Sequence, residues 1–181
     1  ELMPDEAEAH ALLALMLITD ARRDARFDEG TLVLLRDQDR SRWDRGKVDA
    51  GKLALDRALA LGGRGPYLLQ AAIADLHATD EPDWPQIAAL YGELGRLTDS
   101  PVVELNRAAA IAEGGDTEAA LAIVDEVGLD DYVYLHSTRG ELLSRLDRRA
   151  DARAAYDRAL ALAHNDAERR FLQERLAELE R

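Results

Sequence analysis

The chain contains residue types that enzymes use, but their spacing does not match a catalytic or cofactor motif. Two Gly-Lys pairs, at 46–47 and 51–52, are followed by Val48 and Leu53, whereas a phosphate-binding loop needs Ser or Thr after the lysine. The four histidines, at 10, 77, 136 and 164, include no i, i+4 pair, and cysteine is absent. Disulfides and thiolate metal sites are therefore excluded. We expect a protein that is not an enzyme and has no catalytic residue, metal site or cofactor.

One segment carries polar side chains at a spacing that suits binding. After Pro66, the side chains of Tyr67, Gln70 and His77 fall on one side of a helix. A separate apolar stripe would face the core, and it contains Leu69, Ala72, Ile73 and Leu76. Two interpretations stay open for the polar stripe. Its members either tie neighbouring helices together through hydrogen bonds or form a recognition strip on a rigid helix.

A second polar segment lies between residues 37 and 44 and surrounds one tryptophan. Its members are Asp37, Asp39, Arg40, Arg42 and Trp43. We expect a local polar network that anchors Trp43 in the core, with a role in an interface as the alternative. Ser41 and Asp44 have the spacing of a capping box.

The elements that position these residues are predicted to be helices. Alanine and leucine supply most of the apolar surface, and aromatic residues make up only 5% of the chain, a composition typical of helices. A first helix should begin near Pro4, run to about Asp20 and be buried on most sides, because it contains a long apolar run. A loop over 22–30 and a helical turn at 31–35 should follow. Val48, Leu55 and Leu59 mark the inner face of a helix that ends near Leu61.

Beyond the glycine-rich break at 62–65, the sequence predicts helix pairs at regular intervals. Pro66, Pro85 and Pro101 each stand where a helix should begin. The predicted helices span 66–78, 84–97, 101–113, 117–127, 132–146, 149–163 and 166–180.

An internal repeat indicates how these helices are organised. The sequence Asp-Arg-Ala-Leu-Ala-Leu occurs at 56–61 and again at 157–162, a separation close to three tetratricopeptide (TPR) units of roughly 34 residues. Gly140, Ala152, Tyr156 and Ala159 stand at the small and aromatic positions of a TPR unit. We therefore predict an all-α, TPR-like superhelical array. Residues 1–61 would form an N-terminal helical segment packed on helix pairs over 62–181, in one continuous domain.

Within such an array, Asn106 and Arg107 are assigned to the inner groove. Asn106 stands beside Val102 and Ala109, so we expect its amide to find partners in or near apolar surroundings. An asparagine at this place in TPR proteins is common and reaches the groove in peptide-binding members. A structural role has at least equal weight.

Charge and hydropathy narrow the classes of partner. The formal net charge of −13 repels phosphate backbones, so we expect no direct binding of nucleic acid. No apolar run approaches the roughly 20 residues of a membrane span. The first residues contain no basic, apolar leader, and we expect a cytoplasmic protein.

The sequence resembles a known family in several blocks. Residues 65–78, Gly-Pro-Tyr-Leu-Leu-Gln-Ala-Ala-Ile-Ala-Asp-Leu-His-Ala, resemble the GPYQLQAAIAALHA hallmark of a C-terminal extension. This extension occurs in one group of extracytoplasmic-function (ECF) sigma factors. Six further blocks are similar to that family in order and spacing: 2–5, 12–17, 20–23, 35–44, 105–107 and 165–172. Arg64, Leu68 and Asp75 depart from the usual hallmark, which leaves Gln70 as its remaining amide.

The resemblance implies a regulatory, TPR-like extension of a bacterial sigma factor. The two promoter-binding sigma domains would precede residue 1, and this chain would contact them in cis and modulate transcription initiation, reaching RNA polymerase indirectly. A small DGPF/YCII-like protein is a further possible partner. Two alternatives from the residues themselves stay open. One is a general TPR adaptor that binds a peptide, and the other is a small-molecule sensor with a pocket around Asp37, Trp43, Tyr67 and His77.

Overall fold

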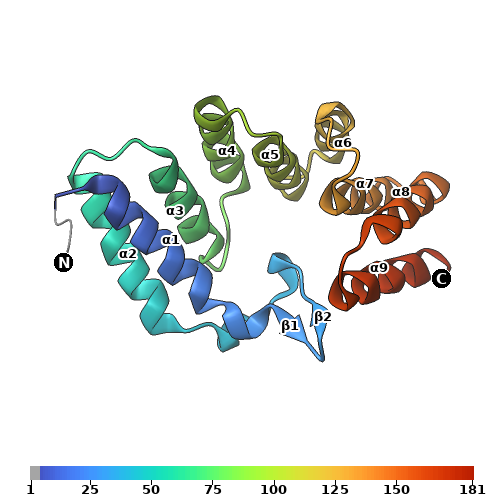
Figure 1. Ribbon diagram of the computed structural model, residues 1–181, viewed down its shortest axis with the longest axis horizontal. Coiled ribbons are helices and arrows are strands. Elements are labelled where there is room, and N and C mark those ends of the chain that lie inside the picture. The colour runs from blue at the N-terminus through green and yellow to red at the C-terminus, as the bar shows by residue number, and fades with distance from the viewer. Residues whose placement is uncertain (1–4) are drawn as a thin grey trace. The chain divides into compact units, whose positions relative to one another are not determined.

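The computed structural model describes residues 5–181, and these residues form an all-α helical array with one short hairpin (Figure 1). Nine α-helices occur within them: α1 (Ala7–Ala21), α2 (Arg45–Ala60), α3 (Pro66–His77), α4 (Trp84–Thr98), α5 (Pro101–Glu113), α6 (Thr117–Glu126), α7 (Val133–Arg145), α8 (Arg149–Leu162) and α9 (Asp166–Leu179). Three 3-10 turns and two strands connect α1 to α2: η1 (Arg23–Ala25), β1 (Phe27–Asp28), β2 (Thr31–Leu32), η2 (Leu35–Asp37) and η3 (Arg40–Arg42).

The predicted helix boundaries from residue 66 onwards are confirmed to within one residue. Pro66, Pro85 and Pro101 lie in the first turns of α3, α4 and α5, where a missing N–H costs nothing. The predicted start at Pro4 lies outside the described residues.

The chain divides into two compact units. The first contains the residues up to Arg26 together with Val33–Asp99, and the second contains Phe27–Leu32 together with Ser100–Arg181. The division expected at residue 61 does not coincide with this grouping, because α3 contacts α1 and α4 extensively. That the units form one continuous domain stays a prediction.

In the first unit, α1 packs against both α2 and α3 (Figure 1). Small side chains allow the close approach: Ala11, Ala14, Ala58 and Ala71 are fully buried in their common core. Gly51 is required at this interface, since a Cβ there would lie 2.5 Å from Cγ1 of Ile18.

Three predictions of buried positions need correction. Met16 on α1 is 61% exposed, so one side of that apolar helix is open. Leu59 is 54% exposed because the inner face of α2 contains Ala54, Leu55 and Ala58 instead. On α3, Ile73 is buried as expected, but Leu68 and Ala71 are the other buried residues.

The second unit consists of helix pairs with the packing that the repeat predicts. Helix α5 packs on α6 and α7 packs on α8, with α9 following on α8. Ala152, Tyr156 and Ala159 are all buried. A Cβ on Gly140 would lie 2.8 Å from the ring of Tyr156, so the glycine admits the aromatic ring between α7 and α8. The two copies of the repeated hexapeptide place Ala58 and Ala159 at equivalent, fully buried positions of α2 and α8.

The hairpin replaces the helical turn expected at 31–35, so that prediction is wrong for its first two residues. Phe27 pairs with Leu32, and Asp28 pairs with Thr31. Glu29 and Gly30 have positive φ angles of 46° and 83°, which suit a tight two-residue turn. Strand β2 contacts α9, and Nη2 of Arg170 donates to the carbonyl of Gly30 at 2.7 Å.

Candidate interaction site around helix α3

The first turn of α3 is held by a carboxylate from α1. Glu8 accepts hydrogen bonds from the backbone N–H groups of Tyr67, at 3.0 Å, and Leu68, at 3.3 Å. A Cβ on Gly65 would lie 2.4 Å from the Glu8 carboxyl carbon. The glycine of the Gly-Pro-Tyr block therefore leaves room for an anion at the helix N-terminus, where unpaired N–H groups favour negative charge.

The predicted stripe on α3 divides into an exposed end and a packed end. Tyr67 is 41% exposed. Nε2 of Gln70 donates to the carbonyl of Pro66 at 3.3 Å, a bond within the helix. His77 is half-buried at the other end. The recognition interpretation therefore suits Tyr67, and the packing interpretation suits His77.

The C-terminal end of α3 is bound by the polar segment 37–44. Nη1 of Arg40 donates to the carbonyl of His77 at 3.0 Å, and the same guanidinium lies 5.1 Å from the ring centroid of Trp43. Trp43 itself is 6% exposed and packs with Ala21, Ala25 and Val48. A buried Trp43 is what the core-anchoring interpretation predicts.

The rest of the polar segment makes local bonds. Asp39 accepts from both the backbone N–H and the hydroxyl of Ser41, and these bonds lower the pKa of its carboxyl. Arg42 donates to the carbonyl of Asp24, and Asp37 is exposed, 3.7 Å from Arg36. The predicted capping box is wrong, because Asp44 is itself the N-cap of α2 and accepts from the N–H of Lys47.

Three residues that the sequence did not single out complete this end of α3. The ring of Trp84 meets the ring of His77 edge-on, with centroids 5.4 Å apart. Arg22, at the C-cap of α1, and Tyr91 on α4 interact electrostatically with each other. Trp84 and Tyr91 share a face of α4 at i, i+7, a spacing that could have indicated them. Arg22 falls within the block 20–23 of the resemblance, but nothing in the sequence separates it from its arginine neighbours.

Burial and nearby positive charge together shift pKa values at the C-terminal end of α3. Burial lowers the pKa of His77 to about 4, with Arg22 and Arg40 contributing in the same direction. Burial also raises the pKa of the Tyr91 hydroxyl and lowers the pKa of Arg22. At neutral pH, His77 is therefore an uncharged imidazole.

The two groove residues predicted on α5 belong to the second unit. Asn106 is exposed, so the expectation that its amide lies in apolar surroundings is wrong. Its neighbour Val102 is 36% exposed as well, because that side of α5 faces outward. Arg107 donates to Glu104 one turn earlier, at 2.8 Å.

The small-molecule pocket considered from the sequence is not assembled as expected. Trp43 and His77 meet through Arg40, whereas Asp37 is exposed and Tyr67 lies at the opposite end of α3. Among residues 5–181, no cluster of three or more His, Asp or Glu side chains could hold a metal ion. None of the helices described is long and apolar enough to cross a membrane.

Comparisons with known proteins divide the chain in a similar way. Residues 1–59 match a family of unknown function (DUF6596), and residues 98–181 match a tetratricopeptide repeat-like domain. "Uncharacterized protein R00370" of Rhizobium meliloti (strain 1021) is 45% identical over 185 residues. The match covers 98% of this chain but only 44% of that relative, so the chain spans less than half of the relative's length. No solved structure matches.

The TPR-like match agrees with the geometry of the second unit. Stacked helix pairs of this kind form extended surfaces for binding other proteins. The architecture therefore points to a role in protein interaction.

Proposed function

We propose that this chain is a regulatory, protein-binding region of an ECF-type sigma factor, which acts by contacting the promoter-binding sigma domains in cis. One observation carries the proposal. The two most specific blocks of the resemblance, residues 35–44 and 65–78, meet through the 3.0 Å hydrogen bond from Arg40 to His77. The two blocks therefore form one structural feature of the first unit.

The first unit also offers a surface that suits such a contact. The Tyr67 ring is fixed to a helix whose first turn is held by Glu8, and it stays 41% exposed. Exposed aromatic side chains on rigid elements are common anchors of protein interfaces. The Rhizobium relative is more than twice as long as the matched region, which leaves room in that protein for further domains.

The proposal is tested by promoter-reporter output from the full-length factor. Tyr67→Ala should change reporter output at unchanged protein level, because it removes the exposed anchor without opening the core. Tyr134→Ala is a matched control, since Tyr134 lies in the second unit and is 42% exposed. Equal output from the wild type and Tyr67→Ala, with folded protein in both, would remove this helix from the mechanism.

Capture of the isolated sigma domains separates this function from that of a general TPR adaptor. The proposal requires that the chain bind those domains. An adaptor unrelated to transcription would ignore them and bind a peptide from another protein. A DGPF/YCII-like partner belongs to the same proposal, and its test is the same capture experiment with that protein as the target. In all these cases we propose binding without catalysis or a cofactor.

A further inference from the structure

A polar cavity of about 170 Å³ lies in the second unit, where α7, α8 and α9 meet. Helix α7 contributes Glu141 and Ser144 to its lining, α8 contributes Tyr156, and α9 contributes Arg175 and Glu178. An engineered cavity of about 150 Å³ binds benzene, so this space admits a ligand group of about six non-hydrogen atoms. Because the lining is mostly polar, a group that fits it carries charge or hydrogen-bonding atoms.

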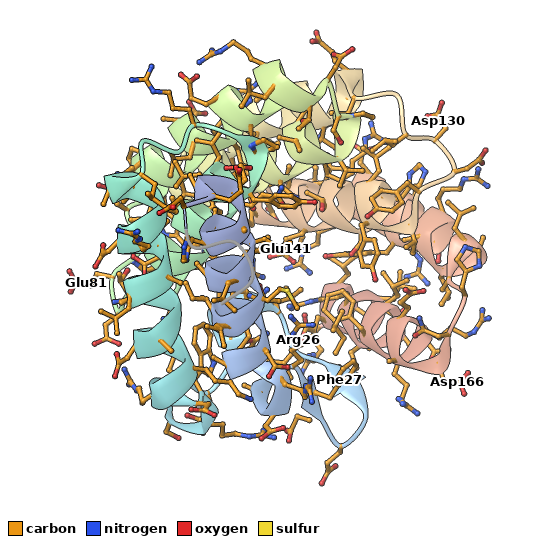
Figure 2. The ribbon with its side chains drawn as sticks, turned by 60° about the vertical axis from the view of Figure 1, so that its left-hand side comes forward. Arg26, Phe27, Glu81, Asp130, Glu141 and Asp166 are labelled. Atoms are coloured by element: carbon orange, nitrogen blue, oxygen red, sulfur yellow. The ribbon has the colours of Figure 1, made fainter. Side chains whose placement is uncertain are left out.

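The inner side of the cavity is built around Glu141, which is labelled in Figure 2. The hydroxyl of Tyr156, a residue that is only 2% exposed, donates to Oε2 of Glu141 at 3.2 Å. Nε of Arg145 donates to the other oxygen, Oε1, at 3.2 Å. Burial and the charge of Glu141 raise the pKa of the Tyr156 hydroxyl, so this hydroxyl stays a donor. Both oxygens of the carboxylate are therefore held in place, as a preorganised binding site requires.

The two arginines of the lining already bind its other carboxylates. Nη1 of Arg175 donates to Oε2 of Glu178 at 2.8 Å. At the exposed rim, Nε of Arg149 donates to Oδ1 of Asp147 at 3.3 Å. An anionic ligand would have to displace these carboxylates from their partners, so the cavity does not favour an anion.

The excess charge of the lining is negative. Among the described residues that line the cavity, Glu141, Asp147 and Glu178 are acidic, whereas only Arg149 and Arg175 are basic. The net charge of the whole chain, −13, has the same sign. A cationic group is therefore attracted to this cavity.

An ammonium group suits this lining better than a guanidinium does. A guanidinium pairs best with both oxygens of a carboxylate at once, and each oxygen of Glu141 already accepts a bond. A carboxylate accepts up to about four bonds, so Glu141 can accept a single further one beside those that hold it. An ammonium group directs three donors from one compact charge. Glu141, Glu178 and the hydroxyl of Ser144 line the same cavity and offer one acceptor for each donor.

We propose that this cavity binds a primary ammonium group, with Glu141, Glu178 and Ser144 as its acceptors. The ammonium group comes either from a lysine side chain of a bound protein or from a free alkylamine. The four-carbon stem of lysine and its ammonium group match the size of the cavity. Because Tyr67 belongs to the first unit, this site goes beyond the contact proposed above.

The experiment titrates the whole ¹⁵N-labelled chain with N-acetyllysine amide and follows the Arg175 Nε–H and Ser144 backbone N–H signals by NMR. N-acetyl-ε-hydroxynorleucine amide, which carries a hydroxyl in place of the ammonium group, is the matched ligand. We expect saturable shifts of both signals with the first ligand and none with the second. Shifts that are equal for both ligands, or absent for both, would overturn the proposal.

Two variants assign the effect to the cavity. Glu141→Gln keeps the shape of the side chain and should weaken the binding of N-acetyllysine amide by about tenfold or more, the usual loss for a charged hydrogen bond. Glu113→Gln is the matched control, because Glu113 pairs with the same Arg145 but does not line the cavity. It should bind the ligand as the wild type does. Equal weakening by both substitutions would show a general charge effect and reject the site.

A substitution at the more exposed Glu178 keeps the test decisive if Glu141→Gln does not fold. Glu178→Gln removes a carboxylate whose side chain is 47% exposed, and it should weaken binding of the same ligand several-fold. Unchanged affinity in this variant would reject Glu178 as an acceptor and, with it, the proposed site.

A parallel titration with n-butylamine, at constant ionic strength, separates the two sources. Equal affinity for butylamine and N-acetyllysine amide assigns the site to free amines. Tighter binding of the lysine derivative assigns it to a protein side chain. Because only small ligands are used, failure here leaves the contact with sigma domains untouched, and failure of that contact leaves this site untouched.

Discussion

The two units use arginine in different ways. In the second unit, arginines pair mainly with carboxylates, as Arg139 does with Asp125 at 2.7 Å and Arg153 with Glu180 at 2.9 Å. In the first unit, Arg23 and Arg96 also pair with carboxylates, but Arg26, Arg40 and Arg42 donate to backbone carbonyls. The second unit is a regular repeat with many surface ion pairs. The first unit uses cations to hold irregular segments against helix ends.

Exposed acids are found in both units. Glu81 in the loop before α4, Asp130 in the loop before α7 and Asp166 at the start of α9 are all exposed (Figure 2). The comparison of the two units can be tested by substituting single residues in each.

The largest expected effect concerns the packing of the second unit. Tyr156→Ala should lower the free energy of unfolding by about 3–5 kcal/mol, because the substitution empties the space of a fully buried aromatic ring. Urea unfolding measures it. Tyr134→Ala removes an exposed ring and should cost less than about 1 kcal/mol. Similar losses for both would show that Tyr156 does not fill the core between α7 and α8.

The fit of Gly140 against Tyr156 sharpens this test. Gly140→Ala places a Cβ 2.8 Å from the ring and should cost about 1–3 kcal/mol in the wild type. In the Tyr156→Ala background the same change should cost less than about 0.5 kcal/mol, because the obstructing ring is gone. Equal costs in both backgrounds would contradict the packing account.

The second prediction concerns the pH dependence of stability that arises from His77 in the first unit. In the native protein the pKa of His77 is lowered to about 4, below its ordinary value of 6.5. Between these values the unfolded chain binds a proton that the native protein does not, so stability is complete above pH 6.5 and is lost as the pH falls. The loss from His77 should be about 2 kcal/mol between pH 7.5 and 5.

Urea unfolding at both pH values checks this effect. His77→Gln should lose that part of the pH dependence, whereas His136→Gln, on α7 of the second unit, should keep it. An unchanged pH dependence in His77→Gln would mean that the native imidazole is readily protonated.

A smaller effect is expected where α1 holds α3. Glu8→Ala should destabilise the first unit by about 1 kcal/mol, because two N–H groups at the start of α3 lose their acceptor. Hydrogen exchange of the Tyr67 and Leu68 amides should accelerate. Glu81→Ala, at an exposed loop position, serves as the control and should change neither quantity.

The smallest effect concerns the surface pairs of the second unit. Arg139→Ala should change the free energy of unfolding by less than about 0.5 kcal/mol, since both partners are partly exposed and screened by salt. A loss above about 2 kcal/mol in urea unfolding would show that ion pairing, rather than packing, holds that unit together.

Much of the fold was predictable because its signals are local. Proline marked the starts of α3, α4 and α5, and the spacing of Gly140 and Tyr156 indicated the packing of a helix pair. The hairpin was missed because Thr31–Leu32 begins the largely apolar run 31–35, and its conformation depends on the Glu29-Gly30 turn and on contacts with α9. Long-range partners of that kind leave no periodic pattern in the sequence.

The site was predictable only in part for a related reason. Arg40, Trp43 and His77 were singled out by composition and resemblance, and the structure joins them. Arg22 and Tyr91 were not, because their significance depends on which helix ends meet. Asn106 was misjudged since its neighbours in the sequence are apolar, whereas its own side of α5 is exposed.

The central claim is tested most directly by isothermal titration of the purified chain with the promoter-binding sigma domains. The account predicts saturable 1:1 binding that Tyr67→Ala weakens by about tenfold or more and that Tyr134→Ala leaves unchanged. No binding by the folded wild-type chain, or equal binding by both variants, would contradict it.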